Sequence, residues 1–204
     1  MPLKEPGTLH TVGHSTRPFE EFVTLLKAHG VAALADVRRY PRSRKFPYFN
    51  DDELAATLPP LGLRYVPIKA LGGRRRAAAD SVNTGWTSEG FRGYADYMQT
   101  PAFEAGLQAL VALASDAPTV IMCAEAVPWR CHRALISDAM LARGWRVLDI
   151  ISETSAPPHE LTAFARVDGT RITYPATGDT PRTRKRRKAS DDRGEAGGQA
   201  SLFE

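Results

Sequence analysis

Over residues 1–152, short and nearly continuous apolar runs alternate with longer stretches in which apolar residues recur at helical spacing. This alternation is typical of strand–helix–strand units, because a strand covered by helices on both faces is apolar throughout. We therefore predict an α/β fold, a single domain with a mostly parallel sheet flanked by helices, followed by a C-terminal tail. The predicted strands are residues 9–13, 31–37, 63–67, 118–123 and 145–151, and the predicted helices are residues 19–26, 51–58, 91–98, 102–113 and 131–143.

The chain of 204 residues has the length of one domain plus a tail, since a domain usually takes about 100–200 residues. Residues 1–174 form the predicted α/β domain. Residues 175–198 contain a basic block and few apolar side chains, so we expect a disordered basic linker that cannot offset the entropy of ordering. Residues 199–204 end the chain with a Leu-Phe pair and form a separate motif.

Composition excludes several classes of protein. No apolar run approaches the roughly 18–20 residues that a membrane span requires, so we expect no membrane partner. The first residues contain no apolar segment typical of a secretion signal. The chain has 2 cysteines, too few for a disulfide framework. Together these features predict a cytoplasmic protein.

Polar residues follow three of the predicted strands at the point where each ends. In parallel sheets, ligands bind outside the carboxyl ends of the strands, so these side chains are expected to share one site. The residues are His14 and Ser15 after the first strand, Asp36 and Arg38 after the second, and Cys123 and Glu125 after the fourth.

Carboxylates at this edge are candidates for acid–base catalysis. Glu125 lies in a loop between a buried strand and a helix, where partial desolvation would suit a general acid or base, helped by Asp36 or His14. The alternative for Glu125 is an ion pair with Arg130 or Arg133. Asp36 has the same two interpretations, because an arginine follows it two positions later.

The two cysteines are either reactive or simply buried. Cys123 at a strand end is a candidate nucleophile, and Cys131 at a helix start has amides nearby that lower a thiol pKa; free cysteines are also often small buried apolar groups. A phosphatase or rhodanese loop needs an arginine six positions after the cysteine, whereas Arg130 is seven after Cys123. Paired Cys-x₂₋₄-Cys spacing is absent, so Cys123, Cys131, His132 and His14 predict no metal, and we expect no cofactor.

Basic residues interleaved with aromatic ones occupy residues 38–49, a pattern that suits phosphate contact and base stacking, although a solvated loop is the alternative. The net charge of +4 is carried in part by the arginine triplet 74–76 and by the basic block 182–188. The triplet lies within a long loop, residues 71–88, that we expect to be mobile. The expected phosphate- or substrate-binding residues, assisted by amides at the start of the helix that includes Cys131, are Ser15, Arg38, Ser43, Cys131, His132 and Arg133.

Six motifs follow one another in the chain: Gly13-His14-Ser15, Asp36-Val37-Arg38 with Pro41 and Ser43, Leu71-Gly72-Gly73, Phe91 with Tyr94-Ala95 and Tyr97-Met98, Met122-Cys123-Ala124-Glu125, and Cys131-His132-Arg133. On these motifs, residues 8–152 resemble the bacterial and archaeal family called domain of unknown function 488. The resemblance implies a small α/β domain. The family name implies no particular reaction.

The end of the chain carries a second resemblance. Gln199, Ala200, Ser201, Leu202 and Phe203 are similar to the pentapeptide by which bacterial replication and repair proteins dock on the DNA sliding clamp. Position two of that peptide is often Leu, so Ala at this position is a departure that weakens the match. The alternative interpretation is that the apolar C-terminus is incidental and does not bind the clamp. A position beyond a flexible basic linker suits a tethered ligand.

Three hypotheses follow. The leading one is a cytoplasmic, nucleoid-associated enzyme of DNA repair or lesion processing, tethered to the sliding clamp, which hydrolyses a base or sugar–phosphate bond. Glycosylase-like chemistry suits carboxylates and base stacking without a metal. The alternatives are a non-catalytic adaptor that binds DNA and the clamp, and a small-molecule enzyme that uses cysteine thiol chemistry.

Overall fold

The centre of the molecule is a five-stranded parallel sheet with the strand order β3-β2-β4-β1-β5. The computed structural model describes residues 7–176. The α/β fold and the parallel sheet predicted from the sequence are confirmed. The strands are β1 (Thr8–Gly13), β2 (Ala33–Asp36), β3 (Arg64–Pro67), β4 (Thr119–Cys123) and β5 (Arg146–Asp149).

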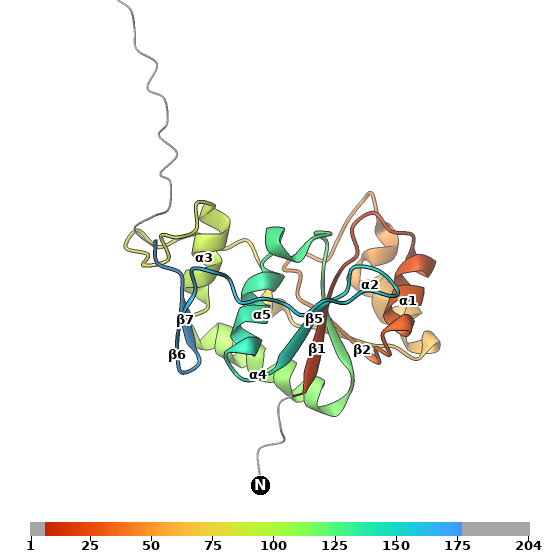
Figure 1. Cartoon of the computed structure of the whole chain (residues 1–204). Helices are drawn as coiled ribbons and strands as arrows, with labels where there is room; N and C mark the ends of the chain where they lie inside the picture. The colour runs from red at the N-terminus through yellow and green to blue at the C-terminus, as the bar shows by residue number, and fades with distance from the viewer. Residues whose placement is uncertain (1–6, 177–204) are drawn as a thin grey trace, which may run out of the picture.

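Helices cover both faces of the sheet, and each face has its own apolar core (Figure 1). One core packs beneath α1 (Phe19–Ala28) and α2 (Asp51–Thr57). The other packs beneath α3 (Glu89–Tyr97), α4 (Pro101–Asp116) and α5 (Arg133–Leu141). β2 is buried along its whole length, which explains why its sequence is a nearly continuous apolar run. Within residues 7–176, no helix combines the length and apolar character needed to cross a membrane.

The chain leaves neighbouring strands in opposite directions at the centre of the sheet. β1 and β4 are paired, with Gly13 opposite Cys123. From β1 the chain passes to α1 on one face, and from β4 it passes to α5 on the other face (Figure 1). This divergence is the topological switch point of an open parallel sheet, where the loops separate and leave room for a ligand. It places the predicted polar residues around one opening.

Three local features differ from the sequence-based expectations. α5 begins at Arg133, so Cys131 precedes it in extended backbone. The irregular segment after residue 71, which we expected to be mobile, is present as predicted. It is nevertheless bound to α3, because Asp96 accepts hydrogen bonds from Ala78 N and from the side chains of Ser81 and Asn83. The sequence analysis missed an antiparallel hairpin formed by β6 (Arg166–Asp168) and β7 (Arg171–Thr173).

A buried network of charged groups joins α5 to the segment that follows β5. Asp138, which is fully buried, accepts a hydrogen bond from Tyr174 Oη at 2.9 Å and lies 3.2 Å from His159 Nε2. His159 Nδ1 lies 3.0 Å from Asp149. Burial alone would lower the pKa of His159, but the hydrogen bonds and charges of the two carboxylates raise it to about 9.

This network predicts a stability change in mild alkali. Because the pKa of His159 is about 9 in the folded protein and about 6.5 when unfolded, its stabilisation is complete below pH 6.5 and is lost as the pH rises to 9. Over this window we expect the free energy of unfolding to fall by about 1–3 kcal/mol more in the wild type than in His159→Gln. Urea denaturation at stepped pH measures this difference. Parallel pH curves for the two proteins would contradict the assignment.

Candidate functional site

The loops that leave β1, β2 and β4 surround two adjoining hollows of about 170 and 440 Å³, which together we call the groove. Arg38, Tyr40, Arg74 and Ala124 line both hollows. The inner hollow is completed by residues that include Arg39, Gly73, Cys123 and His132, and the outer hollow by residues that include His14, Ser15, Arg42, Ser43, Phe46 and Glu125.

Arg38 lies at the floor of the groove in a buried ion pair. Its Nε and Nη2 donate to the two carboxylate oxygens of Asp36 at 2.8 and 2.6 Å, and Nη2 also donates to Phe49 O at 2.7 Å. Asp36 is 1% exposed and accepts two further bonds, from Arg38 N and from Tyr65 Oη. Both carboxylate oxygens are therefore occupied. Of the two interpretations of Asp36, the structure shows the ion pair, in which the carboxylate orients the guanidinium.

His14 is a buried neutral base beside this arginine. Its ring stacks on Phe49 with a centroid separation of 4.1 Å. Nδ1 lies 3.0 Å from the carbonyl oxygen of Ser15, which only accepts, so Nδ1 carries the proton and the lone pair of Nε2 faces Arg38 Nη1 at 3.4 Å. Burial, and then the charge of Arg38, lower the pKa of His14 to about 4. The imidazole is neutral at physiological pH.

The Gly13-His14-Ser15 motif is explained by the close approach of two loops. A Cβ at Gly13 would overlap the carbonyl oxygen of Glu125, so only glycine fits at that position. The next two amides continue the strand pairing, from His14 N to Cys123 O and from Ser15 N to Ala124 O, both at 3.0 Å. Ser15 then adopts a left-handed φ of +52°. Such backbone strain is concentrated at functional sites.

Glu125 differs from its expected environment. The side chain is exposed at the rim of the outer hollow, so the expectation of partial desolvation is wrong. Arg133 Nη2 does contact Glu125, but it donates to the backbone carbonyl at 2.6 Å and not to the carboxylate. Within residues 7–176 that carboxylate forms no ion pair, which leaves it available to a molecule in the groove.

Arg133 points into the protein and does not line the groove. It is 1% exposed, and its guanidinium donates to Glu125 O, to Thr11 Oγ1 at 3.4 Å and to Cys131 Sγ at 3.4 Å. In the first turn of α5, Ala134 N donates to Cys131 O. The structure therefore gives Arg133 a positioning role, in place of the phosphate contact expected from the sequence.

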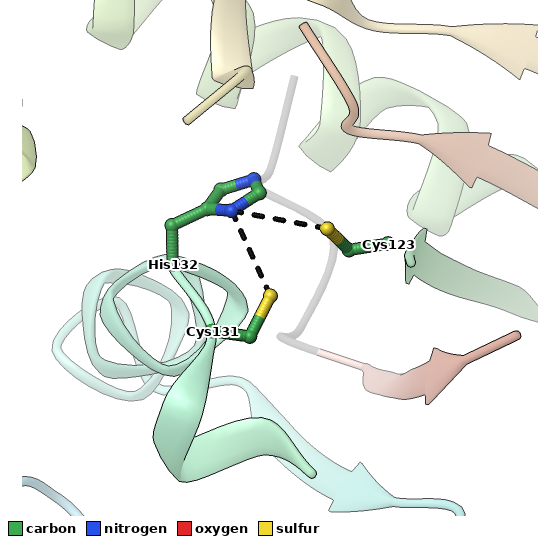
Figure 2. Close-up of side chains that lie close together, drawn as sticks. All are labelled: Cys123, Cys131 and His132. Carbon is green, nitrogen blue, oxygen red and sulfur yellow. Dashed lines mark hydrogen bonds between the residues drawn. The ribbon is translucent and has the colours of Figure 1, made fainter. Parts of the chain in front are cut away.

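Two thiols and one imidazole, those of Cys123, Cys131 and His132, form a cluster (Figure 2), and Cys123 and His132 line the inner hollow. His132 Nδ1 lies 4.0 Å from Cys123 Sγ and 3.7 Å from Cys131 Sγ. His132 Nε2 lies 2.9 Å from Val37 O, so it is the nitrogen that carries the proton, and the Nδ1 lone pair faces both sulfurs. The ring also packs against Tyr94 at 5.1 Å. Both nitrogens of His132 thus have partners in the protein.

The two thiols have unequal acidities. A hydrogen bond from Cys123, contacts with His132 and the charge of Arg133 together lower the pKa of the Cys131 thiol well below its usual range, against the effect of burial. The same hydrogen bond, together with burial, raises the pKa of Cys123. Of the two thiols, that of Cys131 is therefore the more acidic.

The outer wall of the groove is basic and aromatic. Tyr40 is 62% exposed, and its ring centroid lies 5.5 Å from the guanidinium of Arg39 and 5.9 Å from that of Arg74. Arg74 reaches the groove from the long irregular loop with a left-handed φ of +58°. Ser43 is less available than expected, because its Oγ accepts a hydrogen bond from Phe46 N. The arginine triplet in the loop was the sequence signal that pointed to Arg74. Nothing in the sequence pointed to Tyr65, whose hydroxyl donates to Asp36.

Fold and site together define a small α/β protein with an arginine-floored groove at the switch point of its sheet. The family model described as domain of unknown function DUF488 matches residues 18–140, more than half of the chain, and the chain belongs to this family. No curated protein and no solved structure matches it.

The Asp36–Arg38 pair predicts a large and asymmetric effect of mutation. Arg38→Met leaves a buried carboxylate without its countercharge, and we expect the free energy of unfolding to fall by about 3–5 kcal/mol. The double variant Asp36→Asn, Arg38→Met removes both charges and should recover part of this loss. Chemical denaturation of the single and double variants measures both. A double variant no more stable than Arg38→Met would argue against a coupled buried pair.

Proposed function

We propose that this protein is a cytoplasmic, nucleoid-associated enzyme of DNA repair or lesion processing, which binds a nucleic-acid backbone in the groove and hydrolyses a base or sugar–phosphate bond. The observation that carries the proposal is the buried guanidinium of Arg38, held by Asp36 at the floor of a groove with further arginines on its walls. A site of this kind attracts phosphate.

Arg38 lines both hollows, and one nitrogen of its guanidinium is little used within the protein. Nε and Nη2 are used by Asp36 and Phe49, whereas among the described residues Nη1 makes only the 3.4 Å contact with His14 Nε2. Nη1 carries two hydrogens, so at least one is available to a phosphate oxygen. A guanidinium whose orientation is already fixed loses little further entropy when it binds.

Aromatic side chains in the groove suit a nucleotide. Tyr40 and Phe46 lie on the same wall as the arginines, and the exposed ring of Tyr40 offers a face on which a base can stack. Phosphate contacts position the strand, and stacking holds a base that has left the duplex. This combination favours a nucleic acid over a free phosphate ion.

Glu125 is the carboxylate that fits the role of general acid or base. It lies at the rim of the outer hollow with its carboxylate unpaired among the described residues, whereas Asp36 is fully engaged and His14 is a weak base with a pKa of about 4. In this proposal Glu125 activates water or protonates the leaving group, and His14 orients Arg38. Cys123, on the wall of the inner hollow, is the candidate nucleophile for a covalent route.

A pair of variants separates binding from catalysis. Arg39→Ala together with Arg74→Ala removes backbone contacts, and we expect weaker DNA binding and a salt slope smaller by about one per arginine. Glu125→Gln should leave affinity nearly unchanged and lower turnover on damaged duplexes by about 10²–10⁴-fold. Arg146→Ala, an exposed arginine at the opposite end of the sheet, is the matched control.

Fluorescence anisotropy across salt concentrations and cleavage assays on a panel of damaged duplexes give the two readouts. DNA affinity in Arg39→Ala, Arg74→Ala equal to that of Arg146→Ala would contradict the groove assignment. Undiminished turnover in Glu125→Gln would remove Glu125 from the mechanism.

Tethering to the sliding clamp is the second part of the proposal. Its support is the sequence Gln199-Ala200-Ser201-Leu202-Phe203, which lies outside the described residues. A clamp peptide would concentrate the enzyme at replicating or repaired DNA by raising its effective concentration.

Deleting Leu202 and Phe203 should abolish capture of the full chain by an immobilised bacterial sliding clamp, because the apolar pair supplies the buried contact. The matched control deletes nothing and replaces Glu204 by Gln, which changes a terminal side chain outside the pentapeptide. Equal capture of the deleted and intact chains would remove the tether from the account.

The thiol cluster supports a second candidate function. Cys123 lies on the wall of the inner hollow with an imidazole nitrogen 4.0 Å away, an arrangement that also suits a small-molecule enzyme of thiol chemistry. Rapid, selective alkylation of Cys123 near neutral pH would favour it.

A non-catalytic adaptor for DNA and the clamp is favoured instead if Arg38→Ala abolishes function while Glu125→Gln and Cys123→Ala do not.

A further inference from the structure

We propose that Cys123, Cys131 and His132 bind a zinc ion, with its fourth coordination position facing the inner hollow. Among the described residues these are the one group of three whose potential ligand atoms lie close together, all within 4.8 Å of one another (Figure 2). Two sulfurs and one imidazole nitrogen are a ligand set that zinc prefers.

The spacing of the ligand atoms fits a tetrahedral ion. Zinc lies about 2.3 Å from sulfur and 2.0–2.1 Å from nitrogen, which places neighbouring sulfur and nitrogen ligands about 3.6 Å apart. The observed separations from His132 Nδ1 are 4.0 Å to Cys123 Sγ and 3.7 Å to Cys131 Sγ. The two sulfur–nitrogen separations exceed the tetrahedral value by less than half an ångström, and all three ligand atoms lie within 4.8 Å of one another.

His132 is already oriented as a ligand. Its Nε2–H donates to Val37 O at 2.9 Å, which leaves the Nδ1 lone pair directed at the two sulfurs. A hydrogen bond from the distal nitrogen to a carbonyl or carboxylate is the usual support of a metal-binding histidine. Arg133 Nε, 3.4 Å from Cys131 Sγ, gives one thiolate a similar N–H donor.

Gly73 keeps space open beside the ligand nitrogen. A Cβ at this position would lie 2.9 Å from His132 Nδ1, inside contact distance. Gly73 itself has no positive φ, so the glycine is required here by proximity to the histidine. This gives the second glycine of the Leu71-Gly72-Gly73 motif a physical role that the proposed function does not use.

The surroundings define an open site. Cys131 is 4% exposed, while Cys123 and His132 line the inner hollow beside Arg38. Structural zinc sites are closed by four protein ligands, whereas sites with three keep a position for water or substrate. A ligand in that position would lie next to the guanidinium that we assign to phosphate. Metal binding itself does not depend on the nucleic-acid assignment.

Metal analysis of the untagged full chain tests the proposal. After incubation with zinc and desalting, we expect one zinc ion per chain by mass spectrometry, and its loss in Cys123→Ser and in Cys131→Ser. Substitution of cobalt for zinc should give thiolate-to-cobalt charge-transfer absorption and the intense visible bands of a tetrahedral ion. His29→Gln, a histidine outside the cluster, is the matched control and should retain the metal.

Two further measurements guard against variants that fail to fold. In the wild type, zinc should protect the thiol of Cys123, which lines the inner hollow, from a thiol reagent, and a chelator should restore its reaction. Gly73→Ala, with its helical circular dichroism unchanged, should weaken zinc binding by about 10–100-fold through crowding of His132.

A wild-type chain that retains no zinc and gives no charge-transfer band overturns the site, as does a zinc content unaffected by both cysteine variants. Neither result alters DNA binding by Arg39 and Arg74, so the two proposals can fail separately.

Discussion

The groove depends on a buried ion pair between Asp36 and Arg38. An unpaired guanidinium that is 7% exposed would cost several kcal/mol, so Arg38 can occupy the floor only because the carboxylate of Asp36 neutralises it. Tyr65 and Phe49 complete the hydrogen bonds of the pair. The pairing leaves Nη1 with only its 3.4 Å contact to His14 among the described residues. Stability alone does not explain a pair of this kind, because well-packed apolar residues would often serve as well. In the proposed function, a phosphate that needs the charge accounts for the pair.

A second buried arginine, Arg133, stabilises the loops around the groove and does not line it. Arg133 is turned inward and joins Thr11 on β1, the carbonyl of Glu125 after β4, and the sulfur of Cys131. It thereby fixes both the loop that carries the acidic side chain and one thiol of the cluster. Arg38 thus offers charge to the groove, whereas Arg133 maintains its shape. The residues that we propose for phosphate binding and for zinc consequently meet at one switch point of the sheet.

The sequence predicted the sheet well because its central strands β2 and β4 are buried by helices and form apolar runs. The β6–β7 hairpin was missed because its strands are short and mostly exposed. The sequence also located the edge at which the polar residues gather. It could not distinguish Arg38 from Arg133, since the direction of a long side chain is set by tertiary partners. The Cys123–Cys131 separation lacks paired metal-ligand spacing, and the two sulfurs meet only because the loop after β4 returns to the start of α5.

A crystal structure of the full chain with a short single-stranded oligonucleotide tests the central claim most directly. The account predicts a backbone phosphate oxygen within hydrogen-bonding distance of Arg38 Nη1, with a base on the ring of Tyr40. An oligonucleotide bound on another surface, with Arg38 out of contact, would contradict it.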